Sequence, residues 1–161
     1  MRVLGIDPGL RIAGYGCIDY KRSNANPLVV EAGAITMDTK QNVSFRLAQL
    51  YHDIQEIITE LKPNLLAVET IFTHKQQVST ATILGHARGV ILLAGEQASL
   101  PLVELTPAEI KKSVSGNGRA TKTQMQQAVT NTLQLNTLPE PPDVADALAI
   151  AITAALRRER I

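Results

Sequence analysis

Four carboxylates stand where apolar segments of this sequence end or begin: Asp7, Glu69, Asp143 and Asp146. Asp143 and Asp146 are three residues apart, a spacing that puts both side chains on one face of a helix. A carboxylate is costly to bury unless its charge is compensated, and Mg²⁺ prefers oxygen ligands of this kind. Two such ions, about 3.5 to 4 Å apart, can hold the attacking water and the leaving oxygen of a phosphodiester. The four acids therefore indicate a metal-dependent nuclease.

Three of the four acids also have an ordinary structural explanation. Asp7 could cap the turn at Pro8-Gly9, Asp143 could be a helix N-cap, and Glu69 could be a surface residue at a strand end. Asp146 is harder to explain in this way, because its neighbours in VADALAIAITAAL are nearly all apolar or small. It must face either a core or a cleft. No Walker-type phosphate loop and no His, Cys or Ser pattern offers a competing chemistry.

The elements that would position these acids begin with three strands. Residues 3–7, 12–18 and 27–37 are apolar runs that end at turn-forming residues, and their short links predict an antiparallel meander. Gly14 and Gly16 in the second run indicate the close approach of another backbone. The period then changes to that of an amphipathic helix over 44–61, followed by a buried strand at 65–69 that ends on Glu69.

A long helix is predicted over 78–98. Ala81, Gly85 and Gly89 are four residues apart in it. Because glycine costs roughly 1 kcal/mol in a helix, this stripe indicates that another helix packs closely there, from this chain or from a second subunit. A strand at 102–105 follows.

Three further helices complete the predicted order βββαβαβααα. Thr106 and Thr121 begin capping-box patterns for helices that end near Ser115 and Leu135, and the last helix covers about 143–158. No repeat or linker divides the chain. The fold class is therefore a mixed α/β domain, and residues 1–161 form one domain.

Composition narrows the class of protein. With 161 residues, 45% of them hydrophobic, the chain can bury a sizeable core. The single cysteine, Cys17, excludes an intrachain disulfide. No signal-peptide pattern is present, and no apolar stretch reaches the roughly 20 residues that span a bilayer. We therefore expect a cytoplasmic protein.

The charge is unevenly distributed. The net charge is only +1, but residues 106–126 hold four basic residues against one acid, a local charge of +3. Such a patch could contact phosphates, or it could be an ordinary solvated surface.

Five stretches carry a resemblance to a known family: LGIDPGLRIAGYG, LLAVETIF, LGHARGV, IKKSVSGNGRATKTQMQ and DVADALAIAIT. In their order and separations they resemble RuvC-type Holliday junction resolvases (crossover junction endodeoxyribonucleases) of the ribonuclease H-like superfamily, across nearly the whole chain. IDPG alone is not specific, because sugar-kinase-like ATPases begin in a similar way. The five together are specific.

The resemblance implies a five-stranded mixed sheet flanked by helices. It also implies a homodimer that resolves four-way DNA junctions by paired symmetric nicks, in homologous recombination and DNA repair. The implied cofactor is Mg²⁺, two ions per site, with Mn²⁺ as a substitute, and the implied protein partner is a branch-migration helicase. With a net charge of +1, DNA affinity would depend on the combined face of the dimer.

Residue by residue, the catalytic and metal-binding acids of the family fall on the same four carboxylates: Asp7, Glu69, Asp143 and Asp146. Its DNA-contacting lysines fall on Lys111 and Lys122, and its base-stacking aromatic falls on Phe72. From the residues alone, core packing stays open for Phe72. Lys122, in the first turn of a helix, opposes the helix dipole, and a phosphate bound there would explain it. Arg88, in the long helix, is a further candidate for the DNA surface.

Three other functions stay open on the sequence. A related ribonuclease H-like nuclease would act on RNA or flap substrates. A sugar kinase or ATPase would need a second phosphate loop, for which 161 residues leave little room. A junction-binding module without activity would have no need of the four acids.

Overall fold

The computed structural model describes residues 1–23, 26–71 and 78–158. Within them, the five strands are β1 (Arg2–Asp7), β2 (Ile12–Asp19), β3 (Leu28–Thr36), β4 (Leu65–Glu69) and β5 (Leu102–Leu105). The helices are α1 (Val43–Leu61), α2 (Val78–Gln97), α3 (Pro107–Ser115), α4 (Lys122–Thr132) and α5 (Pro142–Arg158). None of the helices in this part of the chain is long and apolar enough to cross a membrane.

The strands form one mixed sheet in the order β3-β2-β1-β4-β5. The first three strands form the predicted antiparallel meander, in which β1 pairs with β2 and β2 with β3. Strands β4 and β5 add in parallel on the other side of β1. The predicted mixed α/β sheet of five strands is therefore confirmed.

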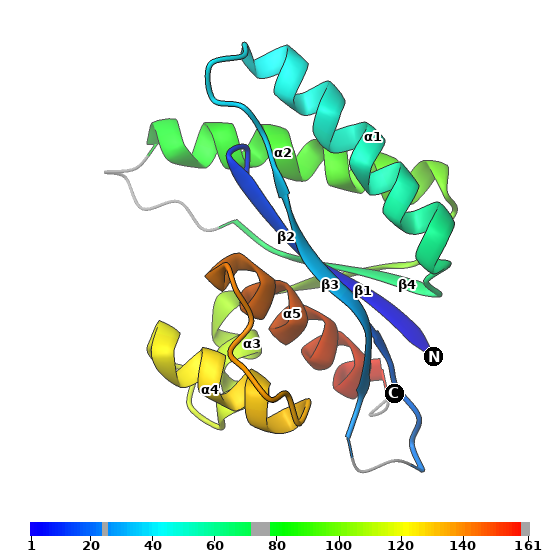
Figure 1. Ribbon diagram of the computed structural model, residues 1–161, viewed down its shortest axis with the longest axis vertical. Coiled ribbons are helices and arrows are strands. Elements are labelled where there is room, and N and C mark those ends of the chain that lie inside the picture. Colours follow the sequence, from blue (N-terminus) through cyan, green and yellow to red (C-terminus); the bar gives the residue numbers. More distant parts are fainter. Residues whose placement is uncertain (24–25, 72–77, 159–161) are drawn as a thin grey trace.

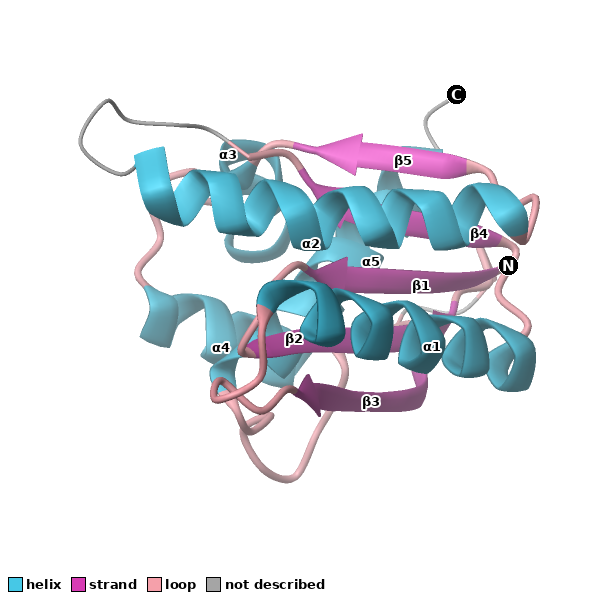
Figure 2. Cartoon of the chain, turned by 90° about the horizontal axis from the view of Figure 1, so that it is seen from above, coloured by secondary structure: helices cyan, strands magenta, loops and turns pink. Residues whose placement is uncertain are grey.

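Helices cover both faces of the sheet (Figures 1 and 2). Helices α1 and α2 pack on one face, and α3, α4 and α5 lie on the other. Strand β4 shows the consequence: Leu65 and Ala67 belong to the core on the α5 side, whereas Leu66 and Val68 belong to the core under α1 and α2. Successive side chains of a strand point to opposite faces, so a strand covered on both sides must be continuously apolar.

Helix ends follow local sequence. The Asn42 side chain accepts a hydrogen bond from the backbone N–H of Phe45 and caps α1, which ends at Lys62 in the left-handed conformation (φ 48°) just before Pro63. The expectation that the fourth helix reaches about Leu135 is wrong. Helix α4 ends at Thr132, because Gln134 adopts φ 53° and turns the chain away.

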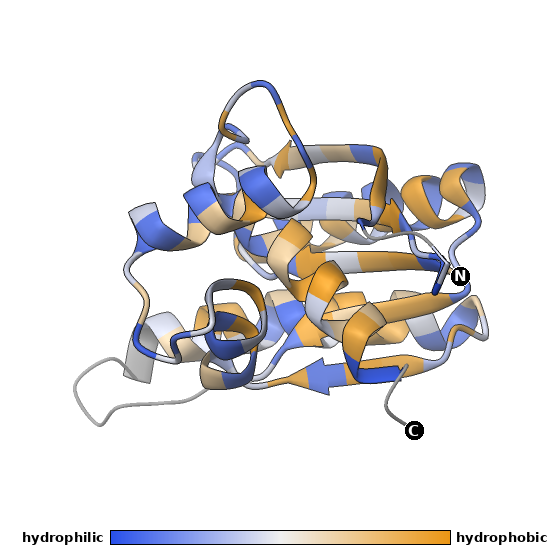
Figure 3. Ribbon diagram, turned by 90° about the horizontal axis from the view of Figure 1, so that it is seen from below, coloured by the Kyte–Doolittle hydropathy of each residue, from blue (hydrophilic) through white to orange (hydrophobic). Residues whose placement is uncertain are grey.

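Helix α5 lies very close to β1 and β2. A Cβ atom built on Gly5 would stand 2.3 Å from the backbone oxygen of Ala147, and one built on Gly16 would stand 2.7 Å from a side-chain carbon of Leu148. The helix that leads to the C-terminus is largely apolar (Figure 3), and residues 147–155 are all buried. The absence of side chains at these glycines thus lets a small-residue helix reach the sheet backbone.

Candidate active site

Asp7 and Glu69 lie side by side at one edge of the sheet. Each is the last residue of its strand, and the strands are parallel neighbours in which Ile6 pairs with Val68. The alternation of side chains gives their direction. Val3 and Gly5 face α5, as do Leu65 and Ala67, so Asp7 and Glu69 also emerge on the α5 side.

The same edge receives the N-terminus of α5, which carries the other two acids. Gly14 pairs with Asp7 in the sheet, and a Cβ atom built on Gly14 would stand only 2.0 Å from the backbone oxygen of Asp143. Helix α5 therefore begins directly above the end of β1. The close backbone approach that Gly14 and Gly16 predicted is confirmed, and the element that makes it carries Asp143 and Asp146.

Two adjoining cavities open at this edge, and Glu69 and Pro107 line both. One cavity, of about 280 Å³, is also lined by Asp7. The other, of about 220 Å³, is lined by Asp146. Asp146, half-buried inside the otherwise apolar α5, thus faces a cleft rather than the core.

Electrostatics show how closely the carboxylates are grouped. Burial first, and then the charges of Asp146, Glu69 and Asp143 in that order, raise the pKa of Asp7 to about 8, whereas the charge of Lys122 opposes them. Burial and then Asp146 raise the pKa of Glu69 to about 7. Burial is also the main cause of the raised pKa of Asp146. The site therefore strongly favours a bound proton or a cation over bare negative charge.

Two lysines from separate helices line the cavity that holds Asp146. Lys111 lies in α3, and Lys122 is the first residue of α4. Thr121 fixes the start of α4 in a capping box with Gln124, as the sequence predicted. The charge of Lys111 lowers the pKa of Glu69 and Asp146. Both predicted DNA-contacting lysines therefore border the carboxylates.

The donor set suits a hard divalent cation, because oxygen is its preferred ligand and the grouped acids need compensating charge. As they stand, however, the His, Cys, Asp and Glu side chains within residues 1–23, 26–71 and 78–158 offer no group of three or more that could hold a metal ion. The acids are thus near one another and mutually repelled, and a cation would have to draw them together.

The two remaining predicted DNA contacts are Phe72 and Arg88. Phe72 lies outside the described residues. Arg88 is described, and its partners are within the protein: its Nε donates to the backbone oxygen of Glu69 at 3.1 Å, and its guanidinium pairs with the Glu104 carboxylate. Sequence reasoning did not single out Glu104. The one signal for it is an acid inside the short strand LVEL.

A family model described as "Crossover junction endodeoxyribonuclease RuvC" matches residues 3–154. The chain belongs to the RuvC family. It is 44% identical over 152 residues to the RuvC of Caldanaerobacter subterraneus subsp. tengcongensis, an alignment that covers 94% of this chain and 90% of that relative.

The solved structures that resemble the chain include RuvC of Thermus thermophilus, at 29% identity and a TM-score of 0.89, with 99% of this chain and 97% of the other covered. The same Thermus protein in complex with a Holliday junction substrate matches with a TM-score of 0.90 at 29% identity, over 99% of this chain and 96% of that one. The ribonuclease H-like α/β fold expected from the sequence is thereby shown, and the family resemblance is confirmed.

Proposed function

We propose that this protein is a divalent-metal-dependent endonuclease that resolves four-way DNA junctions. The observation that carries the proposal is the grouping of the four carboxylates Asp7, Glu69, Asp143 and Asp146 at one edge of the sheet, in a chain of the RuvC family. A solved structure has the Thermus relative in complex with a Holliday junction substrate. The proposal extends that substrate to this chain, as a cytoplasmic enzyme of recombination and repair.

The proposed metal ligands are these four acids. We propose that they hold two Mg²⁺ ions, which when bound would supply a nucleophilic water and stabilise the leaving oxygen. Without a cation, Asp7 holds a proton at neutral pH, since its pKa is about 8. The chain's own contribution would be to release that proton when a cation binds. It would also present four carboxylate side chains from three elements, β1, β4 and α5, at one edge of the sheet.

The lysines would position the substrate. Lys122 is exposed at the first turn of α4, and Lys111 is half-buried in the cavity wall. Phosphate contacts from such residues set the register of DNA but carry no sequence information. We propose that Lys111 and Lys122 bring a phosphodiester to the carboxylates, and that Phe72 stacks on a base near the crossover.

Paired cuts need two sites, so we propose a homodimer. Helix α2 offers a surface for it. Gly85 and Gly89 have nothing within 4 Å of where a side chain would begin, and Leu93 is 51% exposed. An approaching helix from a second copy would bury this face. A branch-migration helicase is the further partner that we propose.

The decisive experiment incubates the purified protein with a synthetic four-way junction and Mg²⁺. We expect symmetric nicks in two strands of like polarity, and no cutting in EDTA. Asp7→Asn should bind the junction with unchanged affinity and leave it intact, because the variant keeps the shape of the site but loses one anionic oxygen donor.

Matched substrates separate the alternatives. A flap, an RNA–DNA hybrid and a linear duplex of the same sequence serve as controls. Cutting of the hybrid or flap in preference to the junction would point to the related nuclease instead. Junction binding with no cutting in Mg²⁺ or Mn²⁺ would point to a binding module. Normal cutting by Asp7→Asn would show that the site assignment is wrong.

A further inference from the structure

Arg88 connects α2 to the end of the strand that carries Glu69. Its Nε donates to the Glu69 backbone oxygen at 3.1 Å, and its guanidinium forms an ion pair with the Glu104 carboxylate. Its side chain is only 18% exposed. A charge-assisted hydrogen bond of this kind is about twice as strong as a neutral one. Arg88 therefore restrains the peptide group that directly follows Glu69, and with it the backbone that carries the Glu69 side chain.

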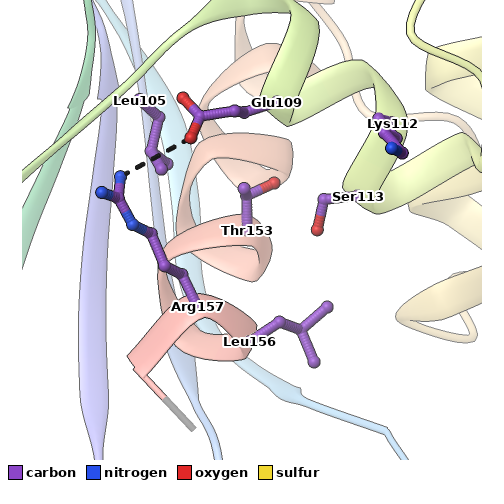
Figure 4. A pocket seen from close by; sticks show the side chains of 7 residues that line it. All are labelled: Leu105, Glu109, Lys112, Ser113, Thr153, Leu156 and Arg157. Atoms are coloured by element: carbon purple, nitrogen blue, oxygen red, sulfur yellow. Dashed lines mark ion pairs between the residues drawn. The ribbon is translucent and has the colours of Figure 1, made fainter. Parts of the chain in front are cut away.

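Glu104 is itself held in place from the opposite face of the sheet. It lies in β5 opposite Val68 of β4, and its backbone oxygen accepts a hydrogen bond from Arg157 of α5 at 3.0 Å. Arg157 also pairs with Glu109 of α3 at 3.8 Å (Figure 4). The acid that receives Arg88 is thus part of a strand fixed to two further helices.

A second hydrogen bond holds the backbone directly after Glu69 against β5. The backbone N–H of Thr70 donates to the Leu105 oxygen at 2.8 Å. The carbonyl of Glu69 and the N–H of the following residue are therefore both engaged, one by α2 and one by β5. Both polar groups of the peptide that follows Glu69 are therefore held, which limits the movement of the Glu69 side chain at the edge of the cavities.

We propose that Arg88 is a positioning residue for Glu69, with Glu104 as its anchor, and that it does not contact DNA. The inference rests on the proposed function only in that Glu69 takes part in the reaction. The planar guanidinium can serve the carbonyl and the carboxylate at once, whereas a lysine ammonium lacks this fork. A displacement of about 1 Å at a reacting group can cost roughly 100-fold in rate.

The two roles for Arg88 predict opposite results for Glu104→Gln. If Arg88 positions Glu69, then Arg88→Gln and Glu104→Gln both lower kcat for cleavage, and the double variant is no worse than Arg88→Gln alone, since the residues act as a unit. If Arg88 contacts DNA, removal of the acid frees it, and Glu104→Gln binds the junction more tightly.

The variants are compared by junction binding in EDTA, by cleavage over a range of Mg²⁺ concentrations, and by hydrogen exchange of the Thr70 amide. We expect Arg88→Gln to lower kcat roughly 10- to 100-fold, to need more Mg²⁺, and to exchange Thr70 faster. Its binding in EDTA and the salt dependence of that binding should not change. Arg88→Lys should recover only part of kcat. The matched control Arg158→Gln, which removes an exposed arginine at the far end of α5, should behave as wild type.

Weaker binding in EDTA by Arg88→Gln, with a salt slope reduced by about 1, would overturn the proposal, because that is the signature of a lost phosphate contact. Unchanged Thr70 exchange would also overturn it. If Arg88→Gln does not fold, Glu104→Gln carries the test, since that side chain is 47% exposed. A wild-type protein that cuts no junction would instead refute the proposed function, whereas the exchange measurement needs no substrate.

Discussion

Replacement of Asp7 by asparagine should stabilise the protein in the absence of divalent metal, although it abolishes the reaction. Burial, together with Asp146, Glu69 and Asp143, raises the pKa of Asp7 from 3.8 to about 8. Asparagine has nearly the same shape and carries no charge. The variant therefore removes the group whose ionisation the native site opposes most strongly.

The direction of this change in stability follows from the proton that Asp7 binds in the native state. Between pH 3.8 and about 8, native Asp7 keeps a proton that the unfolded chain has released, so stability falls as pH rises through this window. At about 1.36 kcal/mol per pH unit, wild type would lose about 4 kcal/mol of its free energy of unfolding between pH 3.8 and pH 7 if nothing screened the charges. Because the side chain is partly exposed and water screens part of the repulsion, we expect a gain of about 2 kcal/mol for Asp7→Asn.

The assay is urea unfolding of both proteins in EDTA at pH 7.5 and at pH 4.5. The variant should be the more stable one at pH 7.5. The difference should shrink to about a quarter at pH 4.5, because that pH lies only about 0.7 pH units above 3.8, the pKa of the unfolded carboxyl. Added Mg²⁺ should stabilise wild type more than the variant, because a ligand stabilises the state that binds it.

Equal stability of the two proteins at pH 7.5 in EDTA would refute the reasoning, because it would show that Asp7 is not opposed by its surroundings. Equal stabilisation by Mg²⁺ would show that Asp7 is not a metal ligand. An Asp7→Ala control separates charge from packing. It should share the electrostatic gain but lose contacts of the carboxylate group.

Three further outcomes are expected. Gly14→Ala should lower the free energy of unfolding in urea by about 1 to 3 kcal/mol and should also impair cleavage. The reason is that its Cβ would stand 2.0 Å from the Asp143 backbone oxygen and displace the start of α5. Wild-type stability of this variant would contradict the prediction. The Cys17 thiol is fully buried and its pKa is raised to about 11 by that burial, so a thiol reagent at pH 8 should label it only at the rate of unfolding. Thr121→Ala should cost about 1 kcal/mol by removing the N-cap of α4, a loss that Thr121→Ser should largely restore.

Local pattern was sufficient for most of the elements. Alternation and helical periodicity place the strands and helices within a residue or two of their observed ends, because both report side-chain burial along a single segment. The capping boxes at Thr106 and Thr121 are confirmed for the same reason: the bonding residues are three apart in the chain. The end of α4 was missed, since the left-handed turn at Gln134 has no strong local signal.

The sequence by itself also singled out the four carboxylates and indicated that some backbone must approach Gly14. It could not say which. Only the tertiary structure shows that β4 pairs in parallel with β1 and that α5 lies on Gly14, and these contacts bring Asp7, Glu69, Asp143 and Asp146 to one edge. The contacts of Arg88 were likewise beyond the sequence, because its partners lie 19 and 16 residues away along the chain. Such pairings depend on how whole faces of helices and strands pack together, and a residue's own neighbours in the chain do not encode that arrangement.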